Sequence, residues 1–482
     1  MHSIKELSPN LVWHYFDEIT KIPRPSKHEE KIREYILNFA KEFNLDFLED
    51  ETGNIVIKKD TTKGKEKNST LVLQSHIDMV TEKNSDSNHN FMTDPIKTYI
   101  EDGWVKAKGT TLGADNGLGV AAQLAILASS DITHGPIEAL FTVDEETGLT
   151  GAFGLGEKMI SGSTLINLDS EDDGQIFIGC AGGVDTIGKY TPQYEETPKG
   201  YFAIEIKISG LKGGHSGDDI EKKLASANKL LVRFLWNAQK EYNLRIASIE
   251  GGNLRNAIAR EAQTISVIPN KFKEEIRVLL NIYSADIEEE YKNSDSNIKL
   301  ELSSTELPEK VFTEKFQTNF LNGLYILPHG VVAMSQEIDD LVETSTNFAS
   351  IKNEDGKIVV STSQRSSLES KKEDIANQVA SIFRMSGAEV IHTDGYPGWA
   401  PNKNSNILKL AAETYKELFD IEPEIRAIHA GLECGLFLEK KPGLDMVSIG
   451  PTIKGAHSPD ERMEIKTVER FWNHLITILD RF

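Results

Sequence analysis

The first part of the chain alternates between two hydrophobic patterns. Apolar residues at helical spacing follow a capping box of Ser26 and Glu29 and predict an amphipathic helix: Ile32, Tyr35, Ile36 and Phe39. Short, mainly apolar runs predict buried strands at 55–57, 71–73, 140–143 and 165–168. The apolar stretch 118–127 follows a glycine-rich turn and predicts a buried helix. Strands that alternate with helices predict an α/β domain with a mainly parallel sheet and helices on both faces.

The pattern changes after Gly182 and Gly183. From 202 to 209, large apolar residues alternate with Ala203 and three polar residues, which predicts a half-buried strand. An amphipathic helix is predicted at 219–236. Further apolar segments predict strands at 246–249, 264–268, 298–302, 357–363 and 389–392, with a helix near 375–383. The middle region is therefore predicted to be α+β, with an antiparallel sheet covered on one side.

Beyond a turn-rich junction at 396–401 the α/β pattern returns. Helices are predicted at 407–418 and 468–479, and a strand at 446–449. The simplest organisation is one α/β domain formed by residues 1–184 and 396–482, into which residues 185–395 are inserted.

Charge and cysteine content narrow the class of protein. The formal net charge of the 482 residues is -22, which disfavours nucleic acid as a partner, although excess acid is more often a solubility device than a metal site. The chain has only two cysteines, Cys180 and Cys434, and one disulfide could not stabilise so long a chain. This favours a reducing compartment. The N-terminal residues lack a signal-peptide core, and no uncharged apolar run could span a bilayer. We expect a cytoplasmic protein without membrane partners.

Acidic and imidazole side chains stand where predicted strands or turns end. They occur in five segments: His76-Ile77-Asp78, Asp115 within 113–117, Glu145-Glu146, Asp169 and His457. Each segment alone has an ordinary explanation, such as a solvated strand end, a turn or a helix cap. In open α/β sheets, however, ligands collect at the carboxyl ends of strands, and all five segments offer metal ligands there.

This mixture of side chains suits a pair of zinc ions. Zinc binds imidazole nitrogen and carboxylate oxygen, and one carboxylate can bridge two ions about 3.5–4 Å apart. One glutamate must stay off the metal to act as general base. Glu145 and Glu146 can divide these roles, because neighbours on an extended segment point to opposite sides. Asp78 can hold the second imidazole nitrogen of His76.

At these residues the chain resembles the di-zinc exopeptidases, a family that includes carnosinases, aminoacylases and carboxypeptidase G. Within that family it is most similar to the aminoacyl-histidine dipeptidases, also called cytosol non-specific dipeptidases. The resemblance covers essentially the whole chain, and its motifs are 76–80, 113–117, 144–148, 167–171 and 213–217. It implies that the α/β domain is catalytic and that the insertion is a lid that contacts the substrate.

The resemblance also implies a role for each residue. His76 and Asp169 would bind one zinc, Glu146 and His457 the other, and Asp115 would bridge them, with Glu145 as general base and Asp78 as the partner of His76. In the lid, His215 would polarise the scissile carbonyl, Asn256 would bind substrate, and Arg365 would grip its free carboxylate. Gly431 matches a loop that lines the pocket. One departure is Ala259, where family members commonly have proline.

The expected activity is hydrolysis of dipeptides such as β-alanyl-histidine, with two Zn²⁺ per subunit and Mn²⁺ or Co²⁺ as possible substitutes. Two kinds of alternative remain. An N-acyl amino-acid deacylase or a tripeptidase would use the same site, and a non-catalytic binding protein would have a peptidase fold that has lost its activity. A homodimer is expected. Whether His215 serves its own site or a partner's is left open by the sequence.

Overall fold

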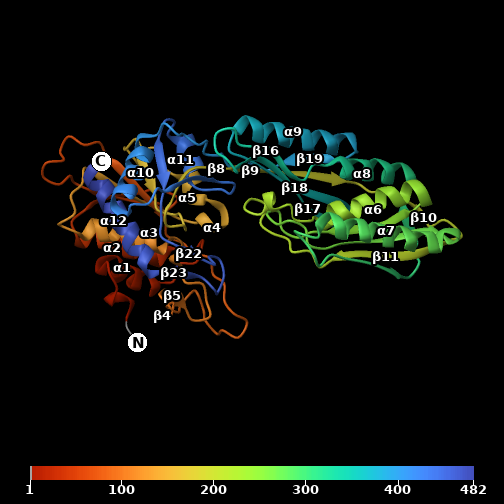
Figure 1. Cartoon of the computed structure of the whole chain (residues 1–482), viewed down its shortest axis with the longest axis horizontal. Coiled ribbons are helices and arrows are strands. Elements are labelled where there is room, and N and C mark those ends of the chain that lie inside the picture. The colour runs from red at the N-terminus through yellow and green to blue at the C-terminus, as the bar shows by residue number, and fades with distance from the viewer. Residues whose placement is uncertain (1–2) are drawn as a thin grey trace. The chain divides into compact units, whose positions relative to one another are not determined.

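The structure, a computed structural model, describes residues 3–482. The chain forms two compact units, each described here by itself (Figure 1). The first consists of residues up to Gly179, Pro401–Ala427 and Leu432–Phe482, and the second, inserted unit consists of Cys180–Ala400 and Ile428–Gly431. The inserted unit thus begins at 180, where the sequence predicted 185, and its main segment ends at 400, where the sequence predicted 395. The reason is that antiparallel backbone hydrogen bonding pairs Cys180 with Trp399 and Gly183 with Tyr396.

The first unit is built on a mixed sheet. In order across it, the strands are β1 (Asp46–Glu49), β2 (Ile55–Lys59), β6 (Ile137–Thr142), β3 (Leu71–His76), β7 (Thr164–Asn167), β21 (Asp445–Ser448), β8 (Gln175–Cys180) and β20 (Glu424–Ile428). The central strands β6, β3, β7 and β21 run parallel, whereas β1, β2 and β8 pair antiparallel to their neighbours. β3 is buried along its whole length, as its uninterrupted apolar run predicts for a central parallel strand.

Helices pack on this sheet, α3 against β3 and α10 against β21. The helices of this unit are α1 (Asn10–Thr20), α2 (Glu30–Glu42), α3 (Ala114–Ala128), α4 (Glu145–Gly148), α5 (Thr150–Gly154), α10 (Asn406–Phe419), α11 (Cys434–Lys440), α12 (Ile465–Arg481) and the 3-10 turn η1 (Ile4–Glu6). A small antiparallel sheet joins β22 (Ile453–Lys454), β23 (Arg462–Glu464), β5 (Trp104–Ala107) and β4 (Thr98–Glu101). Nearly all of α3 is buried, in agreement with the predicted buried helix.

The inserted unit has a larger antiparallel sheet. Its order is β14 (Lys299–Ser304), β11 (Tyr201–Ser209), β13 (Ala262–Pro269), β12 (Arg245–Gly251), β17 (Val342–Glu354), β18 (Lys357–Ser366), β9 (Gly182–Tyr190) and β19 (Glu389–His392), and β16 (Gly330–Met334) also pairs with β17. Two short strands, β10 (Tyr194–Glu196) and β15 (Lys310–Phe312), pair with each other. The predicted fold class, an α/β domain with an inserted α+β domain, is confirmed.

Four helices of the inserted unit are longer than one turn: α6 (Ala227–Tyr242), α7 (Lys273–Tyr291), α8 (Glu314–Ile326) and α9 (Glu369–Met385), within residues 3–482. The short 3-10 turns are η2 (Ile220–Lys222) and η3 (Asn270–Phe272). The helix predicted to begin near 219 begins only at Ala227. The reason is that Lys223 adopts a left-handed conformation with φ 55°, which ends η2.

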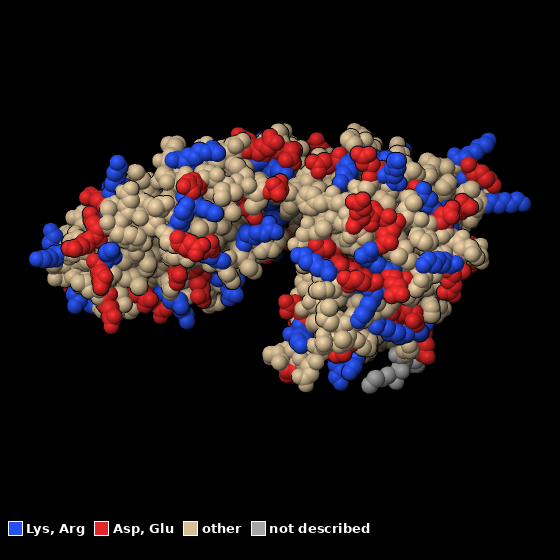
Figure 2. All heavy atoms as spheres, turned by 180° about the vertical axis from the view of Figure 1, so that it is seen from behind, with Lys and Arg blue, Asp and Glu red and all other residues tan. Residues whose placement is uncertain are grey.

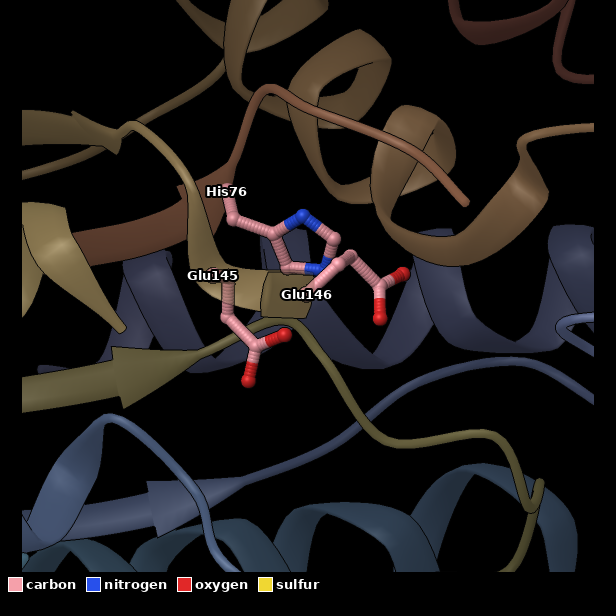
Figure 3. Close-up of side chains that lie close together, drawn as sticks. All are labelled: His76, Glu145 and Glu146. Carbon is pink, nitrogen blue, oxygen red and sulfur yellow. The ribbon is translucent and has the colours of Figure 1, made fainter. Parts of the chain in front are cut away.

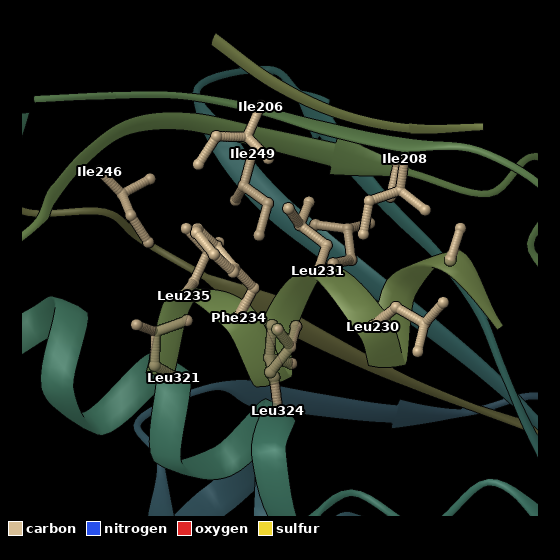
Figure 4. Close-up of a cluster of buried hydrophobic side chains, with 14 of the residues drawn as sticks. Ile206, Ile208, Leu230, Leu231, Phe234, Leu235, Ile246, Ile249, Leu321 and Leu324 are labelled. Atoms are coloured by element: carbon tan, nitrogen blue, oxygen red, sulfur yellow. The ribbon is translucent and has the colours of Figure 1, made fainter. Parts of the chain in front are cut away.

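The core of the inserted unit lies between α6 and the sheet. Leu231 and Leu235 of α6 pack with Ile206 and Ile208 of β11, and Leu324 of α8 lies beside them (Figure 4). Ile204, Ile206 and Ile208 are buried and their sequence neighbours are not all so, which is the alternation predicted for a half-buried strand.

Acidic and basic side chains are interspersed over the face of each unit drawn in Figure 2. This distribution fits the interpretation of the acid excess as a solubility device. Among residues 3–482, no helix combines the length and apolar character that a bilayer crossing requires.

Candidate metal centre

The strand ends that the sequence singled out meet at one edge of the sheet. β3 ends at His76, β6 ends at Thr142 shortly before Glu145 and Glu146, and β7 ends at Asn167 shortly before Asp169. Because β6, β3 and β7 are parallel neighbours, their carboxyl ends lie at the same edge. Asp115 lies in the first turn of α3, and His457 lies between β22 and β23.

Asp115 faces both histidines. Its Oδ1 lies 3.1 Å from His76 Nε2, which is also 3.3 Å from Asp169 Oδ1. Its Oδ2 lies 3.2 Å from His457 Nε2, which is 2.9 Å from Glu146 Oε2. Two groups of possible ligand atoms result, each within a span of 4.8 Å, and Asp115 belongs to both. The arrangement is the one that two cations sharing one carboxylate would need.

Glu145 and Glu146 lie on a short helix and not on the extended segment that the sequence suggested. Asp144, at φ 49°, turns the chain directly into α4. The two carboxylates nevertheless diverge, as Figure 3 shows beside the imidazole of His76. Ligand atoms of His76, Glu145 and Glu146 also lie within 4.8 Å of one another. Geometry therefore leaves Glu145 two possible roles, as a ligand or as a base.

Asp78 organises the segments around His76. It is fully buried, its Oδ1 lies 3.2 Å from His76 Nδ1, and its carboxylate accepts the backbone N–H groups of Glu145 and Glu146 at 3.1 and 3.2 Å. The hydroxyl of Ser26 donates to it at 2.7 Å. One carboxylate thus orients the imidazole and the helix that carries both glutamates.

The predicted capping box is wrong, and its residues serve the site instead. Glu29 is itself the residue before α2, and no side chain caps that helix. Its carboxylate accepts the backbone N–H groups of Lys27 and Asp144 at 2.9 and 3.0 Å. The serine of the expected box donates to Asp78. Tertiary partners outcompete the local cap at both positions.

Burial and mutual charge perturb the acids of the cluster. Burial, with the charge of Asp115, raises the pKa of Glu146 to about 7, and burial raises the pKa of Glu145 well above its usual range. Hydrogen bonds with Asp115 and Glu146 raise the pKa of His457 to about 11. Buried carboxylates are costly unless a cation compensates them.

The donor set fits divalent cations. Glu146 Oε1 is buried and has no hydrogen-bond partner among the described residues, so it has an unused acceptor position. Imidazole nitrogens together with carboxylate oxygens are the ligands of catalytic zinc, and carboxylate-rich sites also accept manganese.

Two further residues at the site escaped the sequence reasoning. Asn116 donates a short hydrogen bond to Asp169 Oδ1 and another, at 2.9 Å, to Leu168 O. Glu433, also buried, accepts from Gln74 Nε2 at 2.6 Å and Thr142 Oγ1 at 2.8 Å, beneath the strand ends. The partners of both residues are remote in sequence, so no local pattern indicates these hydrogen bonds. For Glu433, the one signal in the sequence is that a glutamate stands within a largely apolar segment.

His215 and Asn256, which were predicted to contact the substrate, lie on two loops that pair with each other. Ser216 N donates to Asn256 O at 2.8 Å, and His215 bridges Ala257. His215 Nδ1 accepts the backbone N–H groups of Gly217 and Asp218, each at 3.3 Å, and the Asp218 carboxylate lies 3.1 Å from the same nitrogen. The side chain of Asn256 is exposed.

Arg365 of the insertion and Gly431, which the predicted boundaries placed in the second part of the catalytic domain, both lie against Tyr396. Arg365, on β18, donates from Nη1 to Tyr396 Oη at 2.8 Å, while its Nε is buried without a hydrogen-bond partner among residues 3–482. Gly431 is so close to the same ring that a Cβ atom would come within 2.8 Å of it. The segment Ile428–Gly431 belongs to the inserted unit because Ala181 N donates to Ile428 O and Ala430 O.

Comparisons with known proteins agree with this description. The chain is 43% identical over 480 residues to the cytosol non-specific dipeptidase of Escherichia coli (strain K12), covering 99% of both chains. Its fold matches that of the aminoacylhistidine dipeptidase of Vibrio alginolyticus with a TM-score of 0.91 and 43% identity, over 100% of this chain and 98% of that one. A tripeptidase of Staphylococcus aureus, 18% identical with a TM-score of 0.57 and 98% of each chain covered, shares the fold. The pattern of peptidase family M20/M25/M40 matches residues 72–481, and the chain belongs to that family.

Proposed function

We propose that this chain is a two-metal dipeptidase that hydrolyses short peptides of the Xaa-His type, such as β-alanyl-histidine. The observation that carries the proposal is Asp115, whose two oxygens each face one of two groups of ligand atoms. The dipeptidase names of the relatives that align over nearly the whole chain support the substrate class. A cytoplasmic location and a homodimer are part of the same proposal.

The proposed ligands divide between the two ions. His76 and Asp169 would hold one ion, Glu146 and His457 the other, and Asp115 both. When bound, two divalent ions polarise the scissile carbonyl and lower the pKa of the attacking water toward ~7. Zinc is the expected metal, with manganese or cobalt as substitutes. Asp78 keeps His76 in the tautomer that presents Nε2.

Glu145 is proposed as the general base. Its carboxylate lies among the ligand atoms, and burial raises its pKa, which would make it a stronger proton acceptor once bound cations favour its ionised form. A carboxylate of this kind accepts the proton of the attacking water and then delivers it to the leaving amine. Glu146, on the adjacent position of α4, is left to its role as a ligand.

The inserted unit is proposed to supply substrate contacts. His215 Nδ1 faces two backbone N–H groups and the Asp218 carboxylate of its own loop, so Nε2 is the ring nitrogen that would donate a hydrogen bond to the developing oxyanion. The unpartnered Nε of Arg365 suits the free carboxylate of a dipeptide. Asn256 and Gly431 would complete the substrate pocket.

Metal analysis combined with a substrate panel tests the proposal. We expect two divalent ions per chain, hydrolysis of β-alanyl-histidine and simple dipeptides, loss of activity on chelation and recovery with Zn²⁺. If the protein cleaves N-acetyl amino acids or tripeptides faster than dipeptides, it is a deacylase or a tripeptidase and the proposed dipeptidase activity is wrong. Turnover that ignores chelators would refute the two-metal mechanism, and two bound ions without hydrolysis of any of these substrates would indicate a binding protein.

A further inference from the structure

A buried carboxylate grips the turn that carries Asp115. Glu461, 2% exposed, accepts the backbone N–H groups of Leu112 and Gly113 through Oε2 at 2.6 and 2.9 Å. Its Oε1 accepts the N–H groups of Ala114 and Asp115 at 2.8 and 3.3 Å. Because these N–H groups lead into α3, they have no carbonyl partners within the helix and depend on an outside acceptor.

The buried guanidinium of Arg24 binds a carbonyl group of the same turn. Arg24, also 2% exposed, donates a short hydrogen bond from Nη2 to Gly113 O. Its Nη1 donates to Ile77 O at 3.0 Å and to Asp78 O at 2.6 Å. One guanidinium therefore links the turn to the segment that directly follows His76.

The turn fits the guanidinium closely. Gly113 has φ +70°, and a Cβ atom there would lie 2.6 Å from Arg24 Nη2 and 2.9 Å from Met79 Sδ. A Cβ atom on Gly117 would also come within 2.6 Å of Arg24 Nη2. Glycine is required at 113 both for its conformation and for this approach of Arg24.

These contacts connect Asp115 to both histidines that it faces. Glu461 stands four residues after His457 on the same connection between β22 and β23. Arg24 binds the carbonyls that follow His76. We propose that Glu461 and Arg24 are positioning residues that hold Asp115 at the spacing two cations need before either cation binds. The inference rests on the proposed two-metal site and assigns neither residue to the reaction itself.

A matched control separates this role from ordinary stabilisation. Glu138, 3% exposed, accepts Ser161 N and Gly162 N at 2.7 and 3.1 Å. It lies near the amino end of β6, whereas the metal cluster follows the carboxyl end of that strand. E138Q and E461Q therefore both replace a buried carboxylate that binds loop N–H groups, and only E461Q touches the Asp115 turn.

The test measures Zn²⁺ affinity of the metal-free proteins by competition with a chromophoric chelator, alongside unfolding midpoints. We expect E461Q to weaken the binding of at least one ion by about 10–100-fold, because outer partners of ligands have effects of that size, and E138Q to stay near wild type. Added Zn²⁺ should restore kcat of E461Q with little change in KM. Affinity of E461Q within twofold of E138Q would overturn the inference, whatever the loss of stability.

Two other variants serve if E461Q does not fold. E461D keeps the charge but is one methylene too short to reach all four N–H groups, and R24K keeps the charge but loses the fork that joins three carbonyls. Each should also weaken Zn²⁺ binding, and unchanged affinity in a folded E461D or R24K would count against the inference. A wild-type protein that binds two ions but cleaves no peptide would refute only the proposed function, since the affinities would still be compared.

Discussion

Replacing Glu145 with glutamine tests the division of labour between the two adjacent glutamates. The amide keeps the size of the side chain but cannot accept a proton from water. The backbone N–H of residue 145 still donates to Asp78, so α4 should keep its place.

The expected loss follows from the role of the base. General-base catalysis contributes about 10²–10⁴-fold, which corresponds to about 3–5 kcal/mol of transition-state stabilisation. We therefore expect kcat of E145Q on β-alanyl-histidine to fall at least 100-fold while two ions remain bound, since the five proposed ligands are untouched. Initial rates and elemental analysis on the same preparation measure both quantities, with the exposed Glu157→Gln as control.

Two results would refute this reasoning. A kcat within tenfold of wild type would remove Glu145 from its assigned role as base. Loss of one ion per chain would instead show that Glu145 is a ligand, in line with the alternative group that it forms with His76 and Glu146.

Three further predictions follow from the structure. R365K should raise KM for dipeptides by about 10-fold or more with a smaller change in kcat, because lysine cannot make the paired hydrogen bonds of a guanidinium; an unchanged KM would exclude carboxylate binding. His474 is buried, its Nε2 donates a hydrogen bond to Ala411 O at 2.8 Å, and burial lowers its pKa to about 4. The unfolded chain therefore takes up this proton first as pH falls below 6.5, so His474 by itself should lower the free energy of unfolding by about 2 kcal/mol between pH 7 and pH 5. In urea unfolding, the fall with pH should be smaller by this amount in H474F, while the exposed-site variant H14F should keep the wild-type fall. L235A should destabilise the inserted unit by about 2–5 kcal/mol in the same assay, since Leu235 is fully buried, and the exposed control K240A should lie near wild type.

Local patterns in the sequence determined much of the fold. Mainly apolar runs indicated β3, β6 and β7, and an alternating pattern indicated β11, because a strand buried on both faces and a strand buried on one face differ in the order of their residues. The candidate ligands were accessible for a related reason. Parallel strands end at a common edge, so acids and imidazoles placed after successive strands are predicted to meet there.

Tertiary structure alone decided which polar groups bind one another. Ser26 and Glu29 match a capping box in sequence, yet they bind Asp78 and the Asp144 backbone. Glu461 lies far along the chain from the N–H groups of 112–115 that it accepts. A hydrogen bond between remote residues imposes no periodicity on either segment, so no pattern announces it. The sequence by itself thus determined which residues could hold two cations, and only the folded chain decided what holds those residues in place.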